Sequence, residues 1–349
     1  MPTKFEVNTN WTKVPQHIRI DNCHELAQSR DGRVFLSVDC PENNILIFTE
    51  QGKFLESWTL GFDGTHGLTL FEDEGQEYLL ITQTGVTEIN GVVNKGLGKV
   101  VKTTLDGKVL HTFKNPFELG LYEQGLTYNP TETCVASNGD IYIADGYGAS
   151  FVHCFDRKGT YKHTFGGFSE LDSSLLNPHG IAIDSRSGTE RLVVSSRKQS
   201  RFKFYTLDGE YIEAIHLPGA YPCRPVIKGD YLYAGVCWSG PIVSDVDLEN
   251  YLERDDNSGF VLILDKQGKV VEALGAEAVL YDNGILTPLC VSEDSPFHHV
   301  HDVLVLEDNK LIISQWRAEQ TLPFSLLYIN HQSDDCDLSL SVNSRLFEG

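Results

Sequence analysis

The stretch HGIAIDSRSGTERLVVSSRKQSRFKFYTLDGEYIEAI, from His179 to Ile215, decides the fold class of this 349-residue chain. Short runs rich in Val, Ile, Phe and Tyr alternate with polar clusters, which is the pattern of antiparallel strands separated by tight turns. Its last turn, TLDGE, places a glycine where a hairpin requires a positive φ angle. We therefore predict four consecutive strands in this stretch.

The same pattern recurs along the chain. Further units begin at His24, His66, Thr131, Cys223 and His301, and several repeat the turn as TEQGK, TLDGK, DRKGT or DKQGK. Six units of about 40 residues predict an all-β fold, a six-bladed β-propeller of four-stranded antiparallel blades. We expect one domain over residues 1–349, closed by pairing of the terminal stretches FEVNTNW and LSLSVNSRLF.

The charge balance restricts the partners. The chain has 28 Lys+Arg against 49 Asp+Glu, a formal net charge of -21 at pH 7. Such a field repels the phosphates of nucleic acids and of anionic membranes. We therefore expect a small-molecule substrate, with no nucleic acid and no membrane partner, and the oligomeric state stays open.

The first residues and the cysteines indicate a location. The N-terminal stretch has no apolar core of a signal peptide, and no later run approaches the roughly 18 apolar residues of a membrane span. The eight cysteines are scattered, without a CxxC pair. These features predict reduced thiols and a cytoplasmic protein.

Four of the six units begin on a histidine, namely His24, His66, His179 and His301. The first strand of each propeller blade lines the central channel, so these side chains should converge at one mouth of it. Three imidazoles with one open position suit a catalytic Zn²⁺ or another divalent ion. A single histidine at a strand start is more commonly a structural residue, but four at equivalent positions favour a metal site. His24 is then either a fourth ligand or a wall residue.

The motifs around these histidines resemble the lyase domain of peptidylglycine α-amidating enzymes, the peptidyl-α-hydroxyglycine α-amidating lyases, which are propellers of the NHL-repeat type. The three zinc-ligand motifs of that family are similar to THGLTL, NPHGIAID and HHVHDVLVLEDNKLIIS, and its catalytic-tyrosine segment is similar to IYIADGYGAS. The resemblance covers roughly residues 60 to 320. It implies zinc on His66, His179 and His301, with Tyr147 and Arg197 in the active site.

The chain also departs from the pattern of that family. Ser195 and Ser196 precede the arginine where the family has Ala-Asp, and Gly148 stands where the animal enzymes have a cysteine. A second family arginine falls near Asp39, which cannot take that part, and His24 is an additional histidine. These differences bear on the substrate more than on the chemistry.

The family reaction breaks the C–N bond of a carbinolamide, or of a similar ureide, and releases an amide and an aldehyde such as glyoxylate. The resemblance implies that Tyr147 is the general base, its pKa lowered by the metal and by Arg197. Arg197 would clamp a carboxylate or hold the tyrosinate, and Asp302 would orient His301 or another ligand.

Two other functions fit the fold: a lactonase-like propeller hydrolase, and a non-catalytic NHL-type module that binds a partner. The acidic stretch Val243–Gly259 is either a structural Ca²⁺ site or a solvated loop. The insertions Gln83–Gly98 and Trp238–Ser258 are expected to overhang one face and shape the pocket.

Overall fold

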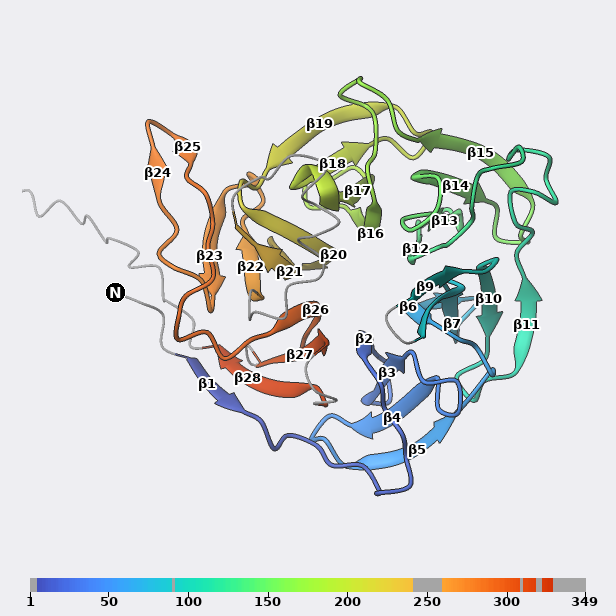
Figure 1. The fold of residues 1–349 in the computed structure, drawn as a ribbon, viewed down its shortest axis with the longest axis horizontal. Helices are drawn as coiled ribbons and strands as arrows, with labels where there is room; N and C mark the ends of the chain where they lie inside the picture. Colours follow the sequence, from blue (N-terminus) through green and yellow to red (C-terminus); the bar gives the residue numbers. More distant parts are fainter. Residues whose placement is uncertain (1–4, 90–91, 241–258, 308–309, 318–321, 329–349) are drawn as a thin grey trace, which may run out of the picture.

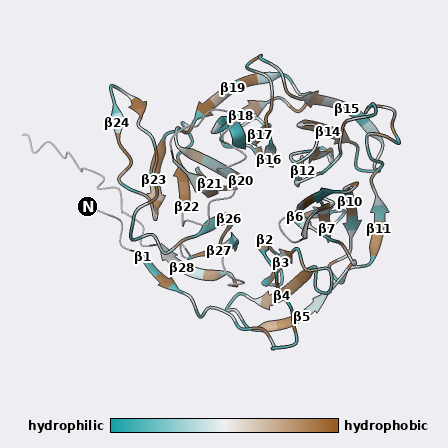
Figure 2. Cartoon of the chain, in the orientation of Figure 1, coloured by the Kyte–Doolittle hydropathy of each residue, from teal (hydrophilic) through white to brown (hydrophobic). Residues whose placement is uncertain are grey.

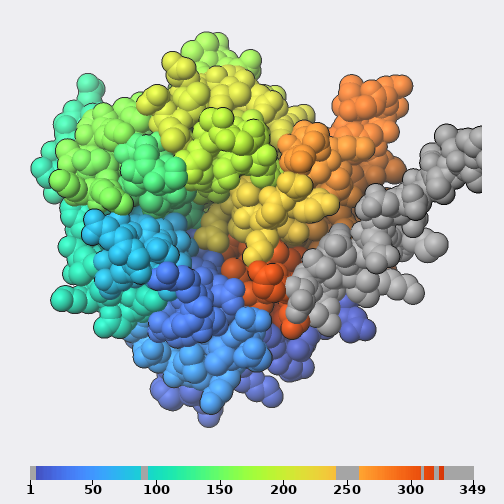
Figure 3. Space-filling model, turned by 180° about the vertical axis from the view of Figure 1, so that it is seen from behind, coloured from blue at the N-terminus to red at the C-terminus, as the bar shows by residue number. Residues whose placement is uncertain are grey.

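The structure of the protein is a computed structural model that describes residues 5–89, 92–240, 259–307, 310–317 and 322–328. Six four-stranded antiparallel sheets stand around a central axis, with the first strand of each unit innermost (Figure 1). The predicted six-bladed all-β propeller is therefore confirmed. The opposite face shows the blades following one another around the molecule in chain order (Figure 3).

The first three blades follow the predicted units closely. Their strands are, for blade 1, β2 (Cys23–Gln28), β3 (Arg33–Val38), β4 (Ile45–Thr49) and β5 (Phe54–Trp58); for blade 2, β6 (Thr65–Asp73), β7 (Gln76–Gln83), β10 (Lys99–Thr103) and β11 (Val109–Thr112); and for blade 3, β12 (Glu132–Val135), β13 (Ile141–Ala144), β14 (Phe151–Phe155) and β15 (Tyr161–Gly166).

The last three blades complete the ring. Their strands are, for blade 4, β16 (Pro178–Asp184), β17 (Arg191–Ser196), β18 (Arg201–Tyr205) and β19 (Tyr211–His216); for blade 5, β20 (Ala220–Lys228), β21 (Tyr231–Ser239), β22 (Phe260–Leu264) and β23 (Val270–Leu274); and for blade 6, β26 (His299–Val305), β27 (Lys310–Trp316), β28 (Phe324–Tyr328) and β1 (Phe5–Asn8).

The outermost strand of blade 6 comes from the N-terminal end of the chain. β1 pairs antiparallel with β28, in a register that runs from Phe5 opposite Tyr328 to Asn8 opposite Ser325. This pairing covers the edge that β28 would otherwise expose. The stretch LSLSVNSRLF, which we expected to be the partner of β1, lies outside the described residues.

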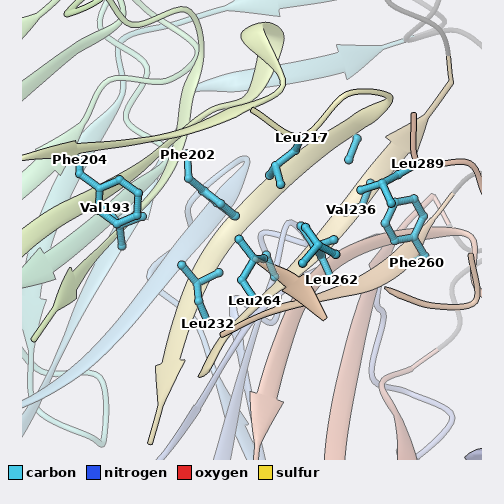
Figure 4. Packing of buried hydrophobic residues seen from close by; sticks show 13 residues of the cluster. Val193, Phe202, Phe204, Leu217, Leu232, Val236, Phe260, Leu262, Leu264 and Leu289 are labelled. Atoms are coloured by element: carbon cyan, nitrogen blue, oxygen red, sulfur yellow. The ribbon is translucent and has the colours of Figure 1, made fainter. Parts of the chain in front are cut away.

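Alternating apolar residues on both faces of each sheet pack against the neighbouring blades. Between blades 4 and 5, Phe202 and Phe204 on β18 meet Leu262 and Leu264 on β22 in one fully buried cluster (Figure 4). Burying a side chain of this size contributes about 1.5–3 kcal/mol. The hydrophobic residues of the molecule gather in the strands and the polar ones in the connections (Figure 2).

The predicted glycine turns are confirmed. The glycines of the five turns TEQGK, TLDGK, DRKGT, TLDGE and DKQGK all have φ angles between +78° and +85°. Within the described residues no helix is long and apolar enough to cross a membrane. A 3₁₀ turn, η1 (Arg197–Gln199), follows β17.

Two short hairpins extend from the blades: β8 (Val86–Ile89) with β9 (Val92–Lys95), and β24 (Tyr281–Asp282) with β25 (Ile285–Leu286). The first belongs to the insertion Gln83–Gly98, and its Lys95 Nζ donates a hydrogen bond of 2.9 Å to the Tyr147 carbonyl oxygen. Most of the second insertion lies outside the described residues, as does the acidic stretch that could be a calcium site or a solvated loop, except for Gly259.

Candidate metal centre

The innermost strands bring six residues to equivalent positions around the axis. These hub positions are occupied by His24, His66, Thr131, His179, Cys223 and His301. The residues that directly follow them in the chain, here called the following positions, are Glu25, Gly67, Glu132, Gly180, Arg224 and Asp302. Nine of these twelve residues have polar or thiol side chains that the fold buries. The other three are Gly67, Gly180 and Arg224.

In every blade except blade 3, a bulge near the hub position turns the side chain toward the axis. In blade 2 the pairing of β6 with β7 jumps from Thr65–Gln83 to Leu68–Ile81, so that His66 and Gly67 have no direct partner. The N–H of Gly67 instead donates to Thr82 Oγ1 at 2.6 Å. A hydroxyl on the second strand takes the same part in blades 1 and 4, where Ser37 accepts from Glu25 N and Ser195 accepts from Gly180 N.

The four predicted histidines lie together at the hub. His301 Nε2 is 3.0 Å from His66 Nε2 and 3.3 Å from His24 Nδ1. The ring of His179 lies 4.8 Å from that of His66 and 4.9 Å from that of His301, measured between centroids. Two nitrogens that bind one zinc tetrahedrally, at about 2.0–2.1 Å each, are about 3.3 Å apart. The spacing of the nitrogens of His24, His66 and His301 therefore fits a shared metal ion, and the His179 ring lies beside them.

Polar contacts at the outer side of two rings leave the inner nitrogens available. His66 Nδ1 is 2.8 Å from the Thr131 carbonyl oxygen, so this nitrogen carries the proton and Nε2 presents its lone pair to the hub. His24 Nε2 lies 3.6 Å from Asp39 Oδ2, which leaves Nδ1 facing His301. Asp39 is thus placed to hold His24.

The electrostatics keep three of these rings neutral. Burial lowers the pKa of His66, His179 and His301 well below the usual value, and the neighbouring histidines and Arg197 lower it further. A histidine binds a metal ion as the neutral imidazole. The lowered pKa values therefore keep these three side chains in the form that can bind a cation.

Tyr147 lies directly above the histidines. Its hydroxyl oxygen is 3.1 Å from His179 Nε2 and 3.3 Å from His66 Nε2. The turn that carries it is held by Asp145, which accepts hydrogen bonds from the N–H groups of Asn129 and Ala149. A Cβ at Gly148 would lie 2.1 Å from Asp145 Oδ1, so the cysteine of the animal enzymes does not fit this turn.

Arg197 is 5% exposed and lies beside Tyr147. Its Nε donates to Asn177 Oδ1 at 2.7 Å, and its guanidinium is 5.6 Å from the centre of the Tyr147 ring and 5.0 Å from that of Trp238. Burial raises the pKa of Tyr147, and the positive charge of Arg197 offsets this only in part. The expected lowering of the tyrosine pKa is therefore not produced by the protein side chains alone.

Asp302 does not have the neighbour that the sequence predicted. Its carboxylate accepts from Leu26 N at 2.8 Å and from the guanidinium of Arg224 at 3.0 and 3.1 Å, rather than from His301. Arg224 also reaches Glu25, at 3.1 Å, and Glu132, at 3.8 Å. Asp302 thus belongs to a buried ion cluster beneath the histidines, and its expected role in orienting His301 is corrected.

Sequence reasoning did not single out Cys223, Arg224, Glu25 or Glu132. The signal was present, because the unit that begins at Cys223 puts a thiol at a hub position and an arginine at the following position. The charges of the following positions are complementary, with three acids facing one arginine. Reading the six units column by column would have found them.

Comparison with known proteins supports an NHL-type propeller. The chain is similar to NHL repeat-containing protein 3 of Homo sapiens, with 26% identity over 220 residues that cover 60% of this chain and 59% of the relative. The Mus musculus protein of the same name is also 26% identical, over 218 residues. The matched part thus spans 59% of the length of these curated relatives. No known family profile matches the chain.

Solved structures show the same fold. A streptogramin B lyase structure superposes with a TM-score of 0.54 at 12% identity, covering 93% of this chain and 97% of that one. A gluconolactonase of Xanthomonas campestris has a TM-score of 0.52 at 13% identity, covering 89% and 87%. At these identities the likeness concerns the fold alone, although both neighbours are enzymes. The relation to the amidating lyases remains a prediction from the motifs.

Proposed function

We propose that the protein is a metal-dependent carbon–nitrogen lyase that acts on an α-hydroxyglycine-like carbinolamide or ureide and forms an amide and glyoxylate or a related aldehyde. The observation that carries the proposal is the position of the Tyr147 hydroxyl, within 3.3 Å of the Nε2 atoms of two hub histidines. A phenol held against two neutral imidazoles is placed to exchange a proton with a hydroxyl group bound at the same point.

The residues that would hold the metal are His66, His179 and His301, with His24 either as a fourth nitrogen donor or as a wall residue of the site. Imidazole donors of this number and spacing suit Zn²⁺. When bound, such an ion lowers the pKa of a coordinated hydroxyl and stabilises the alkoxide.

The chain's own residues would move the proton and orient the substrate. Tyr147 takes the proton of the substrate hydroxyl as the carbonyl bond of the aldehyde forms and the C–N bond breaks. The same proton then passes to the departing amide nitrogen, so that no proton is gained or lost overall. Arg197 offers a planar set of donors to a substrate carboxylate beside the reacting carbon.

The test is the Tyr147→Phe variant in the zinc-loaded full chain. We expect turnover of α-hydroxyglycine or ureidoglycolate derivatives to fall at least about 100-fold, the usual contribution of a proton-transferring side chain, while metal content stays unchanged. Tyr78→Phe is the matched control, because the Tyr78 hydroxyl donates an exposed hydrogen bond to Gln76 Oε1, at the start of β7. Retained turnover in Tyr147→Phe would contradict the proposal.

The alternatives make different predictions. A lactonase-like hydrolase would use carboxylates as calcium ligands, but Glu25, Glu132 and Asp302 are engaged by Arg224, which favours the lyase. A non-catalytic NHL-type module would need no metal. Elemental analysis of the purified protein separates this last function from the other two.

A further inference from the structure

One hub position carries a thiol. Cys223 lies on β20 and is fully buried, and it takes the same place in blade 5 that His179 takes in blade 4 and His301 takes in blade 6. A residue at this place points to the axis for the same reason as the histidines do, since the pairing of β20 with β21 jumps from Pro222–Val236 to Pro225–Ala234 and leaves Cys223 in the bulge.

The sulfur is within reach of two histidines. Cys223 Sγ and one ring nitrogen each of His179 and His301 lie within 4.8 Å of one another, as do the ligand atoms of His24, His66 and His301. His301 belongs to both groups, so it links the thiol and His179 to His24 and His66 at the hub.

Two buried ring nitrogens of these histidines have no hydrogen-bond partner in the described structure. They are the Nδ1 atoms of His179 and His301, whose side chains are 0% and 2% exposed. A buried polar atom left without a partner costs about 1–3 kcal/mol. Coordination of a cation by either Nδ1 atom would remove this cost for that atom.

The surroundings of Cys223 also suit an anionic sulfur. Cys237 Sγ lies 3.3 Å from Cys223 Sγ, and neither cysteine is in a disulfide. The thiol of Cys237 can donate to Cys223, and Arg197 brings a positive charge to the same side of the hub through its position against Trp238. A charged donor and an S–H donor are the partners that stabilise a metal-bound thiolate.

We propose that Cys223 is a thiolate ligand of the hub metal, together with His179 and His301. On binding, the S–H bond of Cys223 breaks, a sulfur–metal bond forms, and one proton is released to solvent. Such a site takes a thiophilic divalent ion such as zinc or cobalt in preference to magnesium or calcium. The inference rests on the metal centre of the proposed function, but the identity of the ligand is a separate claim.

Cobalt binding tests it, with Co²⁺ alone added to the reduced full chain. We expect visible d–d bands together with a near-ultraviolet sulfur-to-cobalt charge-transfer band. Cys223→Ser should lose the charge-transfer band, keep the d–d bands, and bind Co²⁺ at least about tenfold more weakly, the low end of the loss found for substitutions around a metal site. Cys237→Ser, the matched control, should keep the charge-transfer band because Cys237 is not a ligand.

A measurement on the unaltered protein covers the case in which Cys223→Ser does not fold. Zinc X-ray absorption should show one sulfur at about 2.3 Å beside nitrogens at about 2.0–2.1 Å. A shell of nitrogen and oxygen only, or a charge-transfer band that persists in Cys223→Ser, overturns the thiolate ligand and leaves the lyase proposal standing. If the unaltered protein binds neither Co²⁺ nor Zn²⁺, both proposals fall.

Discussion

At the scale of single residues, Asp39 has the largest consequence among the departures from the family pattern. It lies 3.6 Å from His24 Nε2 and accepts hydrogen bonds from the backbone N–H and the side-chain amide of Asn22. Burial would raise the pKa of Asp39, but the hydrogen bonds from His24 and Asn22 lower it below its usual value. The residue is therefore an anion that fixes the ring of His24 with Nδ1 toward the hub.

We predict that Asp39→Asn weakens zinc binding by about 10–100-fold, the range for partners that orient a metal-binding histidine. Competition against a chromophoric chelator measures the change. Asp31→Asn, in an exposed turn that pairs with Arg33, should leave the affinity unaltered. Equal zinc affinities for the unaltered protein, Asp39→Asn and Asp31→Asn would show that His24 is a wall residue and not a fourth ligand.

At the scale of one element, the hairpin of β16 and β17 is held by a buried ion pair. Asp184 is fully buried, and its carboxylate lies 2.8 Å from Arg186 Nε and 3.2 Å from Arg191 Nη2. Burial by itself would raise the pKa of Asp184, but the two arginines and the hydrogen bond from the Arg186 N–H lower it below the usual value. The hairpin that carries His179 thus depends on an ionised carboxylate.

Asp184→Asn should lower the free energy of unfolding by about 3–5 kcal/mol at pH 7, because arginines that are paired in the interior lose their partner. The folded-state pKa lies below the unfolded value of about 3.9, so the carboxylate stabilises the fold above that pH and loses its contribution as the pH falls further. Urea unfolding at pH 7 and at successively lower pH should show the wild type approaching the variant only below about pH 4. A constant difference would contradict this.

At the scale of the whole molecule, Arg224 joins blade 5 to the rest of the ring. Besides its ion pairs, its guanidinium donates to the carbonyl oxygens of Leu26 and Leu68, at 2.9 and 3.1 Å. Burial raises the pKa of Glu25 and Glu132, and it raises that of Asp302 to about 6. One cation therefore compensates the acids of three blades in the centre of the propeller.

Arg224→Met should destabilise the protein by about 3–5 kcal/mol, since it leaves buried carboxylates without a counter-charge. Denaturant unfolding measures this against Arg30→Met, which removes exposed ion pairs with Glu72 and Glu77 and should cost less than about 1 kcal/mol. Adding Glu25→Gln to Arg224→Met should recover part of the loss. Equal destabilisation by the two single variants would mean that the cluster does not tie the blades together.

The hub histidines were predictable because a repeat converts a position in the chain into a position around the axis. His24, His66, His179 and His301 follow from this equivalence, and the structure brings all four within contact distance. The neighbour of Asp302 was not predictable in the same way. That neighbour depends on where each side chain lies along the axis of the propeller. Arg224, the residue that Asp302 contacts, is 78 positions away in the chain.

The sequence by itself determined the number of blades, the four strands of each, the glycine turns and the residues at the hub, because alternation and turn chemistry are local properties that the repeat displays six times. Only the tertiary structure decided that β1 closes the ring on β28, that Asp39 faces His24, and that Arg224 gathers the buried acids. These contacts join residues that are far apart in the chain or that belong to separate repeats, and they depend on bulge geometry and on the closure of the ring.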